Sequence, residues 1–322
     1  MTVSRVLRGT GRTSQATTEK VKAAAKQLGY RPNPMVQCLM THVRKQRVEQ
    51  TSNIAWVMTH RPNESIAEPL LDIERGAQTQ ANELGYAMIR FHLDPELQDA
   101  QALARILKAR GVQGGIIAPV KNPSVQPVFP WEDFALATIG RSLSRPALHY
   151  TMSHHYHIMQ QVLDKVCDHG YHKIGLLIGS PSWEVRVDYA TVMVFQQYCL
   201  QAGIAPDIAY QTCGRWSSSD HLDWFKHFQP DAIIADYGYR YRTLVDAGLP
   251  MAKVGFASLS WKKETTNCSG IKQPFHALGA SAVDLVSAQI IRNERGLPHA
   301  PKAILMEGEW VEGNTLSRIS GE

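Results

Sequence analysis

The feature that most constrains the fold is a regular alternation of short apolar runs and amphipathic stretches along residues 53–256. The apolar runs have the length and composition of buried strands, and the amphipathic stretches end at glycines such as Gly85, Gly111 and Gly170. Strands that alternate with helices favour a parallel sheet covered by helices on both faces. We therefore expect an α/β chain.

The alternation runs twice in similar order. The expected strands are residues 53–58, 86–93, 115–118, 134–139, 173–178, a short one near Ala209, 231–235 and 252–256. The expected helices are residues 69–84, 97–109, 157–169, 189–202, 222–228 and 240–247. Open parallel sheets bind ligands at the carboxyl ends of their strands, so the pattern predicts two Rossmann-like lobes in series with a ligand cleft between them.

The first 47 residues differ in charge from the rest of the chain. Met1 to Arg47 contain ten Lys or Arg residues and one acidic residue, Glu19, which gives a net charge of +9. Because the whole chain carries +5, the remainder carries −4. A small basic segment on a mildly acidic chain is typical of a polyanion-binding segment, although a basic run can also be a solvated face.

The basic segment also has the periodicity of three short helices. The apolar side chains of residues 3–7 share one face of the first helix. Thr17 is expected to cap the second helix, which closes at Gly29, and Asn33 to cap a third over residues 34–43. The third is shorter than the roughly 12–15 residues that are stable alone in water, so it should fold only against a partner.

These residues resemble the head-piece of the lactose-repressor and purine-repressor (LacI) family of bacterial transcription regulators. The resemblance rests on Thr2-Val-Ser-Arg-Val-Leu7, Thr17-Thr-Glu-Lys-Val21 and Leu28-Gly-Tyr-Arg-Pro-Asn33, in family spacing through Leu39. In the family the first motif is the recognition helix of a helix-turn-helix, and the helix and turn that precede it there are absent from this sequence. We therefore expect a truncated helix-turn-helix that binds DNA more weakly than a version extended upstream.

The resemblance implies that the partner is pseudo-palindromic operator DNA, bound by a homodimer. The residues at the family's DNA-contacting positions are Thr2, Ser4, Arg5, Arg8, Arg12, Ser14, Thr17, Tyr30, Asn33 and Leu39. Ser4 and Arg5 are expected to face bases, and most of the others to contact phosphates. Leu39 is expected to wedge into the minor groove, with packing of the hinge helix as its alternative role.

The rest of the chain resembles the family's periplasmic-binding-protein-like effector domain, through motifs such as His169-Gly-Tyr-His-Lys-Ile-Gly175 and Gly308-Glu-Trp-Val-Glu-Gly313. The implied organisation is a small all-α, truncated helix-turn-helix head-piece with hinge helix 34–43 and linker over residues 1–50. An effector-binding and dimerisation domain follows over residues 51–322. Because the lobes of this fold exchange strands, lobe 1 is expected at about 53–150 plus 274–296, and lobe 2 at about 151–273 plus 297–322.

The resemblance further implies allosteric control, usually of a repressor, by a small molecule, typically a sugar, bound between the lobes. The candidate effector-binding residues are Ser65, Arg141, Trp183, Arg186, Trp216, Asp236, Tyr237 and Trp261. The sequence departs from the family pattern at the effector site. Arg186 lies five residues before the usual arginine position, and Ala257 and Ser258 replace the acid that usually binds ligand hydroxyls. Aromatic side chains for stacking on a sugar are plentiful.

Two alternatives remain open. A solute-binding protein that feeds a transporter would share the two-lobed architecture, but it needs an export signal and gives no reason for the basic segment. An effector sensor that has lost DNA binding through the truncated head-piece is the second alternative. DNA affinity measured with and without ligands distinguishes both from a regulator.

Other functional classes find little support in the sequence. His154 and His157 are one helical turn apart, but no carboxylate or thiolate stands at ligand spacing in that run, so we expect no metal site. We find no nucleophile elbow, phosphate loop or zinc-protease motif, and therefore expect neither an enzyme nor a cofactor. Five unpatterned cysteines and the lack of a membrane span favour a cytoplasmic protein, nucleoid-associated when bound to DNA.

Overall fold

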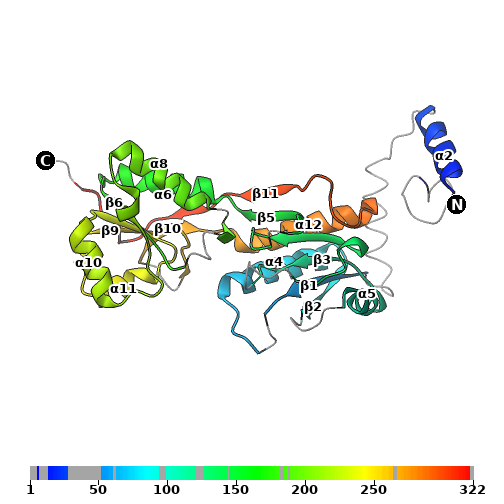
Figure 1. Ribbon diagram of the computed structural model, residues 1–322, viewed down its shortest axis with the longest axis horizontal. Coiled ribbons are helices and arrows are strands. Elements are labelled where there is room, and N and C mark those ends of the chain that lie inside the picture. The colour runs from blue at the N-terminus through cyan, green and yellow to red at the C-terminus, as the bar shows by residue number, and fades with distance from the viewer. Residues whose placement is uncertain are drawn as a thin grey trace. The chain divides into compact units, whose positions relative to one another are not determined.

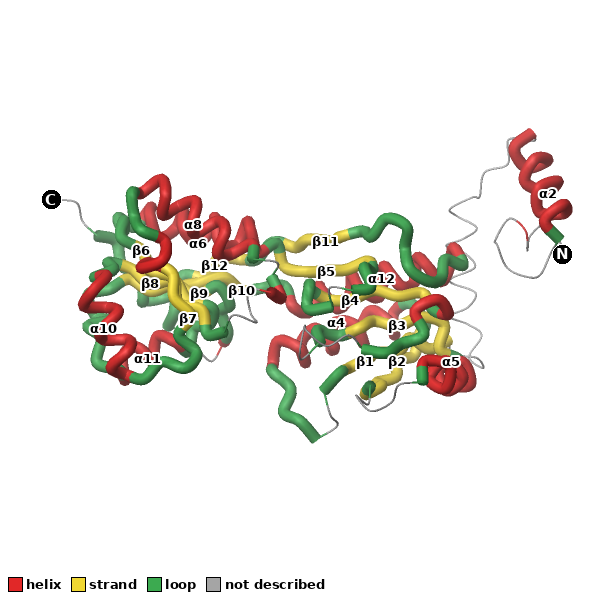
Figure 2. The backbone as a smooth tube through the Cα atoms, viewed as in Figure 1, coloured by secondary structure: helices red, strands yellow, loops and turns green. Residues whose placement is uncertain are grey.

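The computed structural model describes residues 6, 14–27, 52–60, 63–93, 99–120, 127–143, 145–180, 185–187, 189–263 and 267–319. The chain divides into two compact units. Unit 1 comprises Met1–Ile139, Leu143–Thr151 and Phe275–Ile304, and unit 2 comprises Gly140–Ser142, Met152–Pro274 and Leu305–Glu322. Figure 2 shows that the strands of each unit gather in a sheet with helices around it. The predicted α/β class with two Rossmann-like lobes is confirmed.

The sheet of unit 1 has six strands in the order β11-β5-β4-β3-β1-β2. They are β1 (Ser52–Met58), β2 (Tyr86–His92), β3 (Val112–Ile117), β4 (Ala135–Ile139), β5 (His149–Ser153) and β11 (Ala303–Met306). The helices are α4 (Glu68–Glu83), α5 (Ala100–Ala109) and α12 (Phe275–Arg292), with a 3-10 turn at Trp131–Asp133. Strands β1 to β5 pair with one another in parallel, as strand–helix alternation requires.

Side chains of β1 alternate between two apolar cores. Ile54, Trp56 and Met58 pack with α4 and α12 on one face of the sheet. Ala55 and Val57 pack with α5 on the other. All five are fully buried, so β1 is a central strand with helices over both faces (Figure 1).

Helices α4 and α12 approach each other closely at two glycines. A Cβ atom on Gly279 would lie 1.8 Å from the carbonyl oxygen of Ile73 and 2.7 Å from the backbone nitrogen of Ala77. A Cβ atom on Gly76 would lie 1.8 Å from the carbonyl oxygen of His276. Because these neighbours are backbone atoms, neither contact can be relieved by a side-chain rotation.

We expect Gly279→Ala to destabilise unit 1 by about 1–3 kcal/mol, because α12 must move away from α4 and lose packing along its length. This cost exceeds the roughly 1 kcal/mol that alanine gains over glycine inside a helix. Urea unfolding followed by circular dichroism measures the change. Ala277→Ser is the control, since it adds one heavy atom to an exposed position of the same helix. Equal stabilities of the two variants would show that the close approach is not needed.

The sheet of unit 2 also has six strands, in the order β12-β10-β9-β8-β6-β7. They are β6 (Ile174–Ile178), β7 (Tyr210–Thr212), β8 (Ala232–Ala235), β9 (Gly255–Ser258), β10 (Ser269–Lys272) and β12 (Glu309–Val311). Among the described strands of this sheet, β10 and β12 pair antiparallel and the other pairs are parallel. The helices are α6 (His155–Asp168), α8 (Ala190–Ala202), α9 (Pro206–Ala209), α10 (Ser218–Phe228) and α11 (Arg240–Asp246).

In unit 2, α6 and α8 pack together, as do α10 and α11, and Figure 1 shows the two pairs on opposite sides of the sheet. The strand predicted near Ala209 is β7, which begins one residue later, at Tyr210. Two other predicted element positions need correction. Strand β9 runs to Ser258 and begins only at Gly255, after a turn. Helix α10 begins at Ser218, because Ser217 and Asp220 form a capping box.

The helix expected from residue 97 begins at Ala100 as α5, and residue 97 itself lies outside the described residues. The carboxylate of Asp99 accepts hydrogen bonds from the backbone nitrogens of Gln101 (2.9 Å) and Ala102 (3.0 Å). Such a cap satisfies donors of the first turn and so fixes where the helix starts. No helix in the described part of the chain has both the length and the apolarity needed to cross a membrane.

Part of the amino-terminal segment is described. Val6 is helical and buried, and helix α2 spans Gln15–Gln27 with no buried residue. The hydroxyl of Ser14 accepts a hydrogen bond from the backbone nitrogen of Thr17 (3.3 Å), and its carbonyl accepts from that of Thr18 (3.0 Å). Ser14 therefore caps this helix, and the predicted capping role of Thr17, the third residue of α2, is wrong. The predicted hinge helix 34–43 lies outside the described residues.

Candidate functional site

The carboxyl ends of three neighbouring parallel strands meet at one edge of the unit 2 sheet. Strand β7, the next strand in the chain after β6, pairs with one side of β6, and β8 pairs with the other side. The direction in which successive strands are added to the sheet therefore reverses between β6 and β8. Ligands of open α/β sheets bind at such a switch point. Gly179 follows β6, Asp236 follows β8, and residues 259–261 follow β9. We call these residues, with the turn from Asp236 to Arg240, the switch-point edge.

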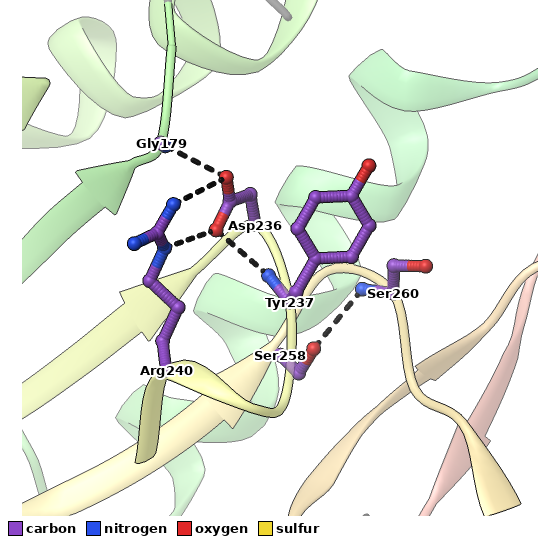
Figure 3. A network of polar contacts seen from close by, with 6 residues as sticks. All are labelled: Gly179, Asp236, Tyr237, Arg240, Ser258 and Ser260. Carbon is purple, nitrogen blue, oxygen red and sulfur yellow. Dashed lines mark hydrogen bonds and ion pairs between the residues drawn. The ribbon is translucent and has the colours of Figure 1, made fainter. Parts of the chain in front are cut away.

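Asp236 organises this edge with its carboxylate (Figure 3). One oxygen accepts hydrogen bonds from the backbone nitrogen of Tyr237 (2.9 Å) and from Nε of Arg240 (2.7 Å). The other accepts from the backbone nitrogen of Gly179 (2.7 Å) and from Nη2 of Arg240 (3.4 Å). The acceptor positions of this buried carboxylate are thus taken by the protein itself. Asp236 links β6 to the start of α11.

The Asp236–Arg240 pair is an ion pair inside unit 2. The Asp236 side chain is 2% exposed and that of Arg240 10% exposed. Burial acts to lower the pKa of Arg240, but the hydrogen bond and the charge of Asp236 outweigh it and raise this pKa above its usual value. Arg240 also lies over the ring of Tyr239, 5.2 Å from its centroid. The guanidinium therefore stays charged and fixed, and it can orient the aromatic side chains around it.

Glycine is required at two positions where this edge is narrow. A Cβ atom on Gly179 would lie 1.9 Å from Nη2 of Arg240 and 2.8 Å from a carboxylate oxygen of Asp236. A Cβ atom on Gly214 would lie 1.6 Å from the carbonyl oxygen of Gly179. The backbone amide of Gly179 can reach the carboxylate only because both side chains are missing.

Aromatic rings and polar groups without a described partner line the same edge. The rings of Tyr237 and Tyr239 stack with centroids 5.6 Å apart and an interplanar angle of 16°. The backbone nitrogen of Ser260 donates to Oγ of Ser258 (3.2 Å), but the buried Oγ of Ser260 has no hydrogen-bond partner among the described residues. The same holds for the indole nitrogen of Trp261. Buried polar groups are normally satisfied, so these two are candidates for ligand contact.

Several predicted effector-binding residues do lie near one another. Asp236 and Tyr237 belong to the switch-point edge, and Trp261 follows β9. Burial lowers the pKa of Arg186, and the nearby Tyr237 partly offsets this shift. The backbone nitrogen of Arg141 donates to the carbonyl of Arg186 (3.2 Å). Contact of these residues with an effector stays a prediction.

The other three predicted effector-binding residues also stay predictions. Ser65 is exposed in unit 1, in the segment after β1. Trp216 packs against the unit 2 core, with its ring edge-on to His221 at a centroid distance of 5.2 Å. Trp183 lies outside the described residues.

The sequence interpretation missed Arg240, Gly179 and Ser260. Asp236 directly follows a buried strand, and Arg240 stands four residues later at the start of the next helix. This spacing was a usable signal for the ion pair. Gly179 gave a weaker signal, since it directly follows the apolar run 174–178. The role of Ser260 could not be read locally, because its lack of a partner depends on the packing of the whole unit.

Of the ten predicted DNA-contacting residues, only Ser14 and Thr17 are described. Their hydroxyl oxygens lie 2.8 Å apart, and Ser14 is exposed. Backbone amides and hydroxyls at a helix start suit a phosphate group. The other eight, Thr2, Ser4, Arg5, Arg8, Arg12, Tyr30, Asn33 and Leu39, lie outside the described residues.

Comparison with known proteins identifies the amino-terminal segment. Residues 1–33 match the family described as bacterial regulatory proteins, lacI family. The HTH-type transcriptional regulator RegA of Clostridium saccharobutylicum is 32% identical over 115 residues, which cover 36% of this chain and 31% of RegA. The HTH-type transcriptional regulator MalR of Staphylococcus xylosus is 24% identical over 189 residues, covering 58% of this chain and 54% of MalR. The chain thus spans about a third of the length of RegA and about half of the length of MalR.

Solved structures share the fold at low identity. The transcriptional regulator CelR in complex with cellobiose has a TM-score of 0.63 at 18% identity, over 97% of this chain and 94% of that chain. The lac repressor dimer bound to operator and an anti-inducer has a TM-score of 0.61 at 19% identity, over 98% and 94%. The regulator CcpA of Lactococcus lactis has a TM-score of 0.60 at 15% identity, over 83% and 99%. The match over residues 1–33 confirms the predicted resemblance to the LacI family, and the solved structures show that the fold is shared.

Proposed function

We propose that this chain, which begins with a lacI-family segment, is a transcription regulator that binds DNA and responds to a small molecule. The observation that carries the proposal is that the match over residues 1–33 falls within Met1 to Arg47, the segment of net charge +9. Neutralisation of phosphates by Lys and Arg supplies much of the affinity for DNA. The proposed function is binding, without catalysis.

The proposed partner is pseudo-palindromic operator DNA, contacted by a homodimer of this chain. Arg8, Arg12, Ser14, Thr17, Tyr30 and Asn33 contact phosphates in this proposal. Ser4 and Arg5, with Thr2 beside them, face the bases of the major groove. Leu39 enters the minor groove when residues 34–43 fold against DNA.

The proposed effector is a carbohydrate bound at the switch-point edge of unit 2. A sugar needs donors and acceptors for its hydroxyls and an aromatic plane against its apolar face. The stacked rings of Tyr237 and Tyr239 offer the plane, and Oγ of Ser260 and the indole nitrogen of Trp261 offer hydrogen bonds that no described residue uses. The cellobiose complex of CelR, which shares the fold, supports this chemical class.

The test starts with selection of duplexes from a random DNA library by the full chain. The affinity for the selected sequence is then measured with a panel of monosaccharides, disaccharides and purines. We expect enrichment of a two-fold symmetric sequence, and at least one sugar that changes the affinity by about fivefold or more. Failure to enrich any sequence would overturn the DNA-binding part. A DNA affinity that every bound ligand leaves unchanged would overturn the control by an effector.

One substitution should separate ligand binding from stability. We expect Trp261→Phe to weaken binding of the active sugar about three- to tenfold, because one hydrogen bond to the ligand is lost. Its stability should not fall, since the indole nitrogen has no described partner in the protein. The control is Trp224→Phe, which removes a 2.9 Å hydrogen bond to the carbonyl of Ile208. That variant should lose about 1 kcal/mol of stability and keep its sugar affinity. Calorimetric titration and urea unfolding measure the two quantities.

A further inference from the structure

Three side chains from distant parts of the sequence converge in unit 2, apart from the switch-point edge. Nδ1 of His154 lies 2.8 Å from one carboxylate oxygen of Glu307, and Nδ1 of His157 lies 2.7 Å from the other. One potential ligand atom from each of the three residues falls within 4.8 Å of the other two. His154 is partly buried, and the side chains of His157 and Glu307 are 53% and 56% exposed.

The backbone holds this arrangement together. His154 directly precedes α6, and His157 lies one helical turn further along. The backbone nitrogen of His154 donates to the carbonyl oxygen of Met306 at 2.7 Å, which fixes the end of β11 beside the start of α6. Glu307 is the next residue, so its carboxylate reaches both imidazoles. The three ligand atoms are positioned by a strand end and a helix start, and these are rigid elements.

We propose that His154, His157 and Glu307 bind one divalent transition-metal ion of the zinc type. Two imidazole nitrogens and one carboxylate oxygen are a ligand set that suits Zn²⁺, Ni²⁺ or Cu²⁺, and water completes the coordination. The expectation of no metal site rested on the lack of a carboxylate near the two histidines in sequence. Glu307, 153 residues after His154, supplies that carboxylate. The proposal goes beyond the proposed function, which assigns no metal.

The charge of the cluster also favours a cation. The carboxylate of Glu307 supplies an anionic ligand, and the hydrogen bond from His154 is the main cause that lowers its pKa. Metal ions and protons compete for the imidazole nitrogens.

The experiment is calorimetric titration of the full chain, free of any histidine tag, with Zn²⁺ at about pH 7.5. We expect one high-affinity ion per chain. His157→Ala and Glu307→Gln should each weaken that binding about tenfold or more, since each removes a ligand. His227→Ala is the matched control, because His227 is an exposed histidine of α10 in the same unit, and it should leave binding unchanged. Absence of a one-to-one site, or equal affinity in His157→Ala, would overturn the proposal.

A spectroscopic measurement identifies the ligands directly. With Cu²⁺ as the probe, electron paramagnetic resonance of the wild-type chain should show coupling to two imidazole nitrogens, and His157→Ala should show coupling to one. Both altered side chains are more than half exposed, so the variants should fold, and circular dichroism checks this. A spectrum that is the same in wild type and variant would place the ion elsewhere, for instance on thiols, and overturn the proposal.

Discussion

Asp236→Ala is expected to lower the stability of unit 2 by about 3–5 kcal/mol. The substitution removes the partner of a guanidinium whose side chain is only 10% exposed and leaves that charge buried without compensation. It also leaves the backbone amides of Gly179 and Tyr237 without the acceptor they use. The loss therefore combines an unpaired charge with two unsatisfied donors. Urea unfolding of the purified variant measures it.

The chain contains a matched control on the same helix. Arg242 and Asp246 form an ion pair with the same four-residue spacing and a distance of 2.9 Å, but their side chains are 81% and 61% exposed. Asp246→Ala should therefore cost no more than about 0.5 kcal/mol. The double substitution Asp236→Ala with Arg240→Met should recover part of the loss, because no buried charge remains. If Asp236→Ala cost no more than Asp246→Ala, the buried pair would not organise the edge.

The central strands could be predicted because both of their faces are apolar. Ile54 to Met58 in unit 1 and Ile174 to Ile178 in unit 2 are continuous buried runs, and such runs carry a local signal. Gly170, which follows α6, marks the boundary before the unit 2 run. Asp236 was found through the resemblance to the LacI family, whose pattern places an acid directly after this buried strand.

Strand β5 shows why other elements escaped the residue pattern. Its polar side chains are buried, but their partners are far away in sequence. Oγ1 of Thr151 donates to the carbonyl of Leu278 across 127 residues, and Nδ1 of His149 accepts from the backbone nitrogen of Lys302 across 153 residues. The local sequence shows only the polar residues of β5 and not the distant groups that bind them. Burial of a polar group depends on a partner that tertiary structure supplies.

The same limit applies to the sites. Arg240 pairs with an acid four residues away, so this contact was within reach of a local rule. Glu307 meets His154 only because β11 ends beside α6. Local patterns therefore identify residues that follow strands, whereas clusters built from distant segments require the fold.

The other large effect concerns DNA. We expect the triple substitution of Arg5, Arg8 and Arg12 by Ala to weaken binding to the selected DNA sequence about 10²–10³-fold near physiological salt. In the proposed interface Arg5 contacts a base, which contributes about 1–3 kcal/mol. Arg8 and Arg12 contact phosphates, so the slope of log affinity against log salt concentration should fall by about 2. Fluorescence anisotropy over a series of salt concentrations measures both changes.

A control variant distinguishes the loss of a specific DNA-binding surface from the loss of net positive charge. Lys226, Lys253 and Lys263 are exposed residues of unit 2, and their replacement by Ala removes the same three positive charges from a chain of net charge +5. If DNA responded only to the total charge, both triple variants would lose affinity equally. If the lacI-family segment is the DNA-binding surface, the unit 2 variant keeps its affinity within about threefold, because its lysines lie outside that segment and salt screens long-range attraction. Equal losses of affinity in the two triple variants would contradict the proposal that the amino-terminal segment binds DNA.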